Sequence, residues 1–158
     1  MNNKIENIRK TIEATEREWR ELGFYYDFDK KFLSWNIYGS KSGISKFAKL
    51  IEEYSNNPRN NIIYEHDHYG PSMFLKIITL EEPEINDNAI GGSLSDLLRL
   101  SEIIKNKIKS ANVGDKIIIN EEYGNSNNAF IRIEIMDDDF DVISLDEWIR
   151  DKKKEINY

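Results

Sequence analysis

The sequence predicts an α+β fold in which a duplicated strand–helix–strand–strand unit forms a largely antiparallel sheet with helices on one face. Three observations support this class: an internal repeat, four segments with helical periodicity, and short alternating segments typical of strands. We expect a single domain over 1–158. Its parts are an N-terminal helix in 1–23, the two copies in 32–80 and 85–137, and a C-terminal helix in 144–155.

The repeat has a period of about 53 residues and is carried by three pairs of segments: 37–44 with 90–97, 62–63 with 117–118, and 73–77 with 129–133. In the first pair Ile37 and Ile90 are followed by matching glycine and serine residues. A period of this size corresponds to one supersecondary unit. Because one copy alone leaves an apolar face uncovered, we expect the two copies to lie side by side in one sheet.

The helices are predicted from the spacing of apolar residues and from their capping residues. Residues 3–22 carry an apolar stripe, formed by Ile5, Ile8, Ile12, Trp19 and Leu22. Ser40 and Ser93 can accept unpaired backbone N–H groups, which predicts helices over 41–55 and 94–110. In the helix at 144–155, we expect Trp148 to pack in the core.

Strands are predicted as three hairpins, over 24–28 with 32–38, 61–67 with 72–80, and 116–120 with 129–136, the last around a loop at 124–127. Within 32–38, Trp35 and Ile37 alternate with Ser34 and Asn36, which indicates one dry face and one wet face. The acidic segment 81–88 is expected to be irregular.

The composition of the chain limits the classes of function that it can have. The formal net charge is −7, so a phosphate backbone would be repelled and we expect no nucleic-acid partner. There is no cysteine, which excludes disulfides and thiolate sites. We find no membrane-spanning segment and no signal peptide, and we expect a cytoplasmic protein. An acidic chain is better suited to steering a basic protein partner.

Two groups of residues are candidates for binding that partner. Glu81, Glu82, Glu84 and Asp87 form an acidic loop, whose carboxylates can mimic phosphates in the basic substrate groove of a nuclease. Tyr38 and Tyr69 are candidate anchors, because tyrosine is favoured at interfaces. A solvated connection is the alternative interpretation of the loop.

The two histidines of the chain, His66 and His68, are the candidate metal ligands. On a strand this spacing places both imidazoles on one face, as a shared metal requires. Glu84 and Asp87 could add oxygen ligands if their loop folds back. The second copy lacks the histidines, and the alternative is a polar strand end. The main interpretation therefore requires no cofactor, and without a Walker A motif or nucleophile elbow we do not expect an enzyme.

Several segments resemble a family of small uncharacterised bacterial proteins that is grouped with predicted immunity proteins of bacterial toxin systems: Gly39 to Ile44, Glu65 to Pro71, Leu75 to Thr79, Glu82 to Ile90, and Gly114 to Lys116. The resemblance covers about 30–140 and leaves out the first helix. It implies no catalytic residues.

The leading hypothesis is an acidic inhibitor that neutralises a cognate toxin by covering its basic active site. Two alternatives remain open. One is a metal-binding module or metal-dependent enzyme centred on His66 and His68, and the other is a self-associating protein, such as a homodimer.

Overall fold

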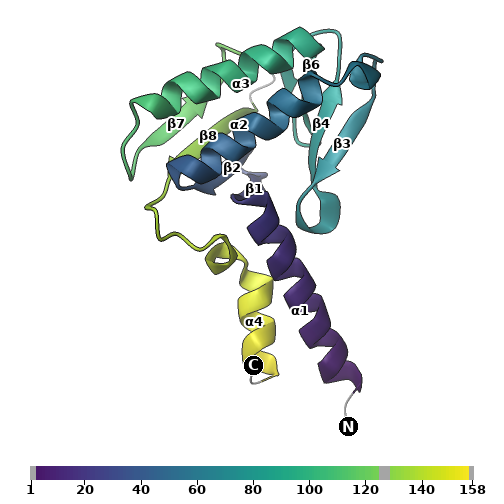
Figure 1. The fold of residues 1–158 in the computed structure, drawn as a ribbon, viewed down its shortest axis with the longest axis vertical. Coiled ribbons are helices and arrows are strands. Elements are labelled where there is room, and N and C mark those ends of the chain that lie inside the picture. The colour runs from purple at the N-terminus through teal and green to yellow at the C-terminus, as the bar shows by residue number, and fades with distance from the viewer. Residues whose placement is uncertain (1–2, 125–128, 157–158) are drawn as a thin grey trace.

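The computed structural model describes residues 3–124 and 129–156. These residues form four helices and two four-stranded mixed sheets, which confirms the α+β class and the helix at each end (Figure 1). The helices are α1 (Asn3–Leu22), α2 (Lys41–Ser55), α3 (Leu94–Lys109) and α4 (Glu147–Glu155). Short 3-10 helices occur at Pro58–Asn60, Pro71–Met73 and Val142–Leu145.

The strands form two sheets, where one sheet had been expected. Sheet A contains, in spatial order, β1 (Tyr25–Asp29), β2 (Ser34–Gly39), β8 (Phe130–Ile135) and β7 (Lys116–Ile119). Sheet B contains β3 (His66–Tyr69), β4 (Leu75–Thr79), β6 (Ile90–Gly92) and β5 (Glu84–Ile85). In both sheets the central pair is parallel and the two outer pairs are antiparallel.

The two copies exchange hairpins, which explains the two sheets. Each copy is a hairpin, a helix and a second hairpin, and its first hairpin pairs with the second hairpin of the other copy. Ile37 therefore lies opposite Ile133 in sheet A, and Ile90 lies opposite Ile77 in sheet B. A parallel pair cannot be joined by a tight turn. Each helix carries the chain from one sheet to the other.

The strand registers test the details of the repeat. Ile77 and Ile133 are equivalent, as the sequence alignment predicts. The alignment of 62–63 with 117–118 is wrong, because His66–Tyr69 takes the place of Lys116–Ile119. The error arises because the two hairpin connections differ in length: residues 70–74 join β3 to β4, and residues 120–129 join β7 to β8.

Some strands and helices begin at other residues than predicted, and each difference has a local cause. The strand expected over 61–67 begins only at His66, because Tyr64 adopts a left-handed backbone with φ of 76°. The acidic segment expected to be irregular contains β5, which pairs with β6. The helix expected over 144–155 begins at Glu147, where Asp146 caps it. Of the predicted loop at 124–127, residues 125–127 lie outside the described part.

Helices α2 and α3 pack together and connect the two sheets (Figure 1). Both begin at the predicted caps, where the Ser40 and Ser93 hydroxyls accept backbone N–H groups. Small residues allow a close approach: the buried Ser101 hydroxyl donates to the Ala48 carbonyl at 2.9 Å. An ion pair between Lys105 and Glu52 joins the same two helices.

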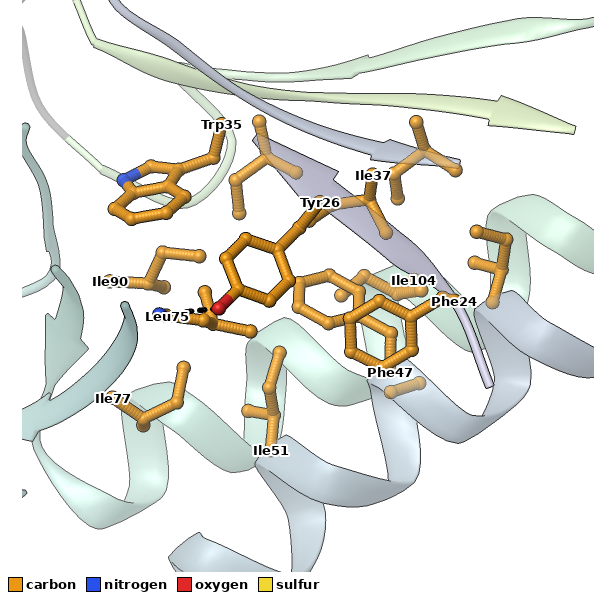
Figure 2. Packing of buried hydrophobic residues seen from close by; sticks show 14 of the residues in the cluster. Phe24, Tyr26, Trp35, Ile37, Phe47, Ile51, Leu75, Ile77, Ile90 and Ile104 are labelled. Carbon is orange, nitrogen blue, oxygen red and sulfur yellow. Dashed lines mark hydrogen bonds between the residues drawn. The ribbon is translucent and has the colours of Figure 1, made fainter. Parts of the chain in front are cut away.

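The core lies between the helices and the inner faces of both sheets, and two polar side chains cross it (Figure 2). Tyr26 of β1 extends toward the β3–β4 hairpin. Its hydroxyl lies 2.9 Å from the Tyr69 carbonyl, to which it donates, and accepts the Leu75 N–H at 3.2 Å. The buried Trp35 indole of β2 donates to the Asn86 carbonyl at 2.7 Å. Side chains of sheet A are therefore hydrogen-bonded to both hairpins of sheet B, β3–β4 and β5–β6.

Helices α1 and α4 lie side by side and project from the sheets, with the two chain ends at the tip (Figure 1). The Trp19 indole donates to Asp146 at 2.8 Å, and Lys153 pairs with Glu16 at 2.8 Å. The expectation for Trp148 is wrong, since 43% of its surface is exposed. Among the described residues, no helix combines the length and apolar character needed to cross a bilayer.

We predict that Tyr26→Phe lowers the free energy of unfolding by about 1–3 kcal/mol, because it leaves the buried Leu75 N–H without its acceptor. Urea denaturation followed by fluorescence measures the change. An unchanged midpoint would show that this hydroxyl does not hold the two sheets together.

Candidate functional site

The candidate site is a groove on the outer face of sheet A, which faces away from α2 and α3. Its lining residues come from β1, β2, β8 and the β1–β2 turn: Asp29, Phe32, Ser34, Asn36, Tyr38, Phe130, Arg132 and Glu134. We call this set the sheet A groove. It encloses about 380 Å³. Alternation along the strands explains its polarity, because the apolar partners of these residues point into the core.

The strand register arranges the groove in rows. Asp27, Asn36 and Arg132 lie opposite one another on three adjacent strands. Tyr38 and Glu134 belong to the next row. Because β2 and β8 are parallel, residues almost a hundred positions apart in the chain become neighbours on one face.

The floor of the groove is a polar network that is buried. The Ser34 hydroxyl donates to the Asn36 side-chain oxygen at 2.9 Å, and the Asn36 amide donates to the Asp27 carboxylate at 2.9 Å. Ser34 and Asn36 are each less than a tenth exposed. The network holds the Asn36 amide in one orientation and turns the Asp27 carboxylate toward it.

The carboxylates of this region are held by neutral donors as well as by one cation. Asp29 accepts the backbone N–H groups of Lys31 and Phe32, at 2.8 and 3.2 Å. Arg132 is paired with Glu134 at 2.9 Å. Asp27, Asp29 and Glu134 with Arg132 carry a formal charge of −2, and Lys116, which lies opposite Glu134 on the same face, brings the charge of this face to −1.

The electrostatics of the groove disfavour negative charge. Burial raises the pKa of Asp27 above its ordinary value, although the hydrogen bond from Asn36 acts in the opposite direction. Burial, followed by the charge of Asp27, raises the pKa of Tyr25 to about 12 and also raises the pKa of Tyr38. Asp146 and Glu147 add to the effect at Tyr25. Both tyrosines therefore keep their hydroxyl protons at neutral pH, and a positive group would relieve the repulsion.

The anchors and loop residues proposed from the sequence lie in three places. Tyr38 lies in the sheet A groove. Tyr69 lies on β3, where it is half-buried and its carbonyl accepts the Tyr26 hydroxyl. The acidic loop lies around β5, at the opposite edge of sheet B from β3. The structure therefore does not gather these residues into one site.

The acidic loop is more ordered than its composition suggests. Glu81, Glu82 and Asp87 are exposed, whereas Glu84 is half-buried and accepts the Asn86 amide at 2.5 Å. The Asn86 side chain also accepts two backbone N–H groups, and its carbonyl accepts the Trp35 indole. Three carboxylates therefore face solvent from a fixed turn.

His66 and His68 do share one exposed face of β3, with ring centres 5.1 Å apart. The expected oxygen ligand Glu84 is too far away. It lies three strand spacings from His66, or roughly 14 Å at about 4.8 Å per strand. Within 3–124 and 129–156, no group of three or more acidic, histidine or cysteine side chains could hold a metal ion.

Sequence reasoning missed the charged part of the groove. The polar face of 32–38 was visible in the alternation of Ser34 and Asn36, although both residues are buried and the face is not wet as expected. The contribution of Arg132 and Glu134 was not, because it depends on the parallel pairing of β2 with β8. Asp27 and Asp29 carried only the weak signal of two carboxylates flanking an aromatic residue.

Comparisons of the chain with protein-family models, with curated proteins and with solved structures found no match.

We predict that Asp27→Asn raises the free energy of unfolding at pH 7. The pKa of Asp27 is raised on folding, so ionising this carboxyl costs the folded state stability at pH values above the raised pKa. The gain should shrink as the pH falls through the raised pKa and disappear below the ordinary value of 3.8, where the carboxyl is protonated in both states.

Urea denaturation between pH 3 and pH 7 measures this difference. Asp29→Asn is the matched control, because the Asp29 carboxylate holds the turn through two backbone N–H groups and its loss should not stabilise the protein. A gain for Asp27→Asn that is equal at all pH values would contradict the account.

Proposed function

We propose that this protein is an acidic inhibitor of the immunity type, which binds a basic protein such as a nuclease toxin and covers its active site. The observation that carries the proposal is the sheet A groove, which combines buried, pre-aligned polar groups with more carboxylates than cations. Asp27, whose pKa burial raises and whose carboxylate accepts the amide of the groove residue Asn36, is a candidate for a functional role.

Charge supports a cationic ligand for the groove. Arginine and lysine side chains are the protein groups that form charge-assisted hydrogen bonds with carboxylates. An incoming guanidinium would meet Asp29 and Glu134 in the lining of the groove, with Asp27 next to the groove residue Asn36. The chain charge of −7 would also raise the rate of encounter with a basic partner.

Aromatic side chains at the groove supply the apolar part of an interface. Phe32 is 61% exposed at the end formed by the β1–β2 turn, and Phe130 is half-buried next to it. Aromatic residues beside a polar cleft are typical anchors, since their burial slows dissociation. A groove that binds one or two basic side chains, flanked by such anchors, fits occlusion of a protein surface.

The acidic loop is a second candidate contact for the same partner. Glu81, Glu82 and Asp87 face solvent, and reversing their charges should weaken binding if the loop enters a basic groove. The homodimer and cytoplasmic expectations remain predictions.

The proposal predicts salt-sensitive binding of a basic partner. Tagged protein should retain such a partner from its native host at about 0.1 M salt and release it at about 1 M salt, where the screening length falls from about 10 Å to about 3 Å. Mass spectrometry identifies the partner, and inhibition of its activity by this chain completes the test. Retention that does not depend on salt would contradict electrostatic recognition.

Charge reversal separates the two candidate contacts. Asp29→Lys with Glu134→Lys should weaken binding of the purified partner by at least tenfold, or about 1.4 kcal/mol. The matched variant, Glu81→Lys with Glu82→Lys, makes the same change of charge in the loop. Equal losses in both variants would mean that only net charge matters, and a loss in the loop variant alone would assign the contact to the loop.

A further inference from the structure

The two histidines lie on the open edge of sheet B, away from the sheet A groove. β3 is hydrogen-bonded to β4 on one side and is the edge strand on the other (Figure 1). His66 and His68 alternate with Asp67, so both imidazoles are on the same exposed face. They are the only histidines in the chain.

Hydrogen bonds fix the tautomer of both rings. The Nδ1 atom of His66 lies 3.0 Å from the Tyr64 carbonyl, and the Nδ1 atom of His68 lies 2.9 Å from the Met73 carbonyl. A carbonyl oxygen can only accept, so each Nδ1 atom carries the proton. In the neutral ring the Nε2 atom then has a free lone pair. Metal-binding histidines show this same pattern, in which a backbone carbonyl orients the ring through its other nitrogen.

Both carbonyls that accept these hydrogen bonds belong to residues with an unusual backbone conformation. Tyr64 and Met73 adopt left-handed conformations, with φ of 76° and 51°. Such conformations cost free energy in residues other than glycine and cluster at functional sites. The two carbonyls come from opposite ends of the β3–β4 hairpin, and both meet a histidine of β3.

The spacing of the rings also fits one metal ion. The ring centres are 5.1 Å apart and the planes are nearly perpendicular, at 88°. Two imidazoles that bind one tetrahedral Zn²⁺ at Zn–N distances of about 2.0–2.1 Å have ring centres roughly 5 Å apart. The observed distance between the ring centres matches this value.

We propose that His66 and His68 form a two-imidazole site for a divalent transition metal such as Zn²⁺ or Ni²⁺. Imidazole nitrogens suit these ions, and the absence of a third protein ligand among the described residues leaves the other positions to water. The proposal is independent of the sheet A groove. Lys76 lies opposite His68 in the strand register, and its charge should weaken metal binding.

The experiment is a Zn²⁺ titration of untagged protein, followed by isothermal calorimetry and by NMR of the two histidine rings. Before metal is added, both rings should show the Nδ1-protonated tautomer. Both should then shift together and saturate at one metal per chain. His66→Ala or His68→Ala should each weaken binding by at least about tenfold. Lys76→Gln should strengthen it.

A matched variant separates chelation from the mere presence of histidine. Asp67→His combined with His68→Ala keeps two histidines but places them on opposite faces of β3, so it should bind as weakly as His68→Ala alone. Metal binding retained in this variant would overturn the proposal. So would independent shifts of the two rings, or no shift at millimolar Zn²⁺.

Discussion

The two central parallel strand pairs are the constraint on which the rest of the structure depends. Ile37 against Ile133 and Ile77 against Ile90 join hairpins that belong to different copies. In this structure neither copy completes a sheet with its own strands, because each sheet takes one hairpin from each copy. The helices that cross between the sheets pack closely through Ala48 and Ser101, and the Tyr26 hydroxyl joins sheet A to the β3–β4 hairpin of sheet B.

The same pairing creates the sheet A groove. Because β2 and β8 run parallel, the polar residues of one face line up in rows, and Asn36 is held between Asp27 and Arg132. The duplication does not give sheet B an equivalent groove, since Gly91 occupies the position of Tyr38 and the Leu80 side chain lies against it. The two copies have therefore diverged: one sheet has a polar groove and the other has an exposed histidine pair.

Local signals in the sequence were sufficient for most of the elements and insufficient for their assembly. Apolar periodicity and the serine caps located α2 and α3 almost to the residue, because these signals act within one turn of a helix. The alternation of Trp35 and Ile37 with Ser34 and Asn36 separated the apolar face from the polar face, but the expectation that the polar face is wet is wrong, since Ser34 and Asn36 are buried. The exchange of hairpins between copies was not visible in the sequence. The two copies have the same apolar pattern, so a hairpin buries its apolar face equally well against its own copy or the other one. The charged half of the groove depends on that exchange, so Arg132 and Glu134 could not be assigned to it.

NMR observation of the Asn36 side-chain amide, during titration with an arginine-rich peptide, tests the central claim most directly. This amide lies in the floor of the groove and donates to Asp27, so a guanidinium that binds there must change its environment. We expect the Asn36 amide and the Tyr38 ring signals to shift together and to return when salt is added. Shifts confined to 81–88, with Asn36 unchanged at saturation, would contradict the assignment of the groove as the binding site.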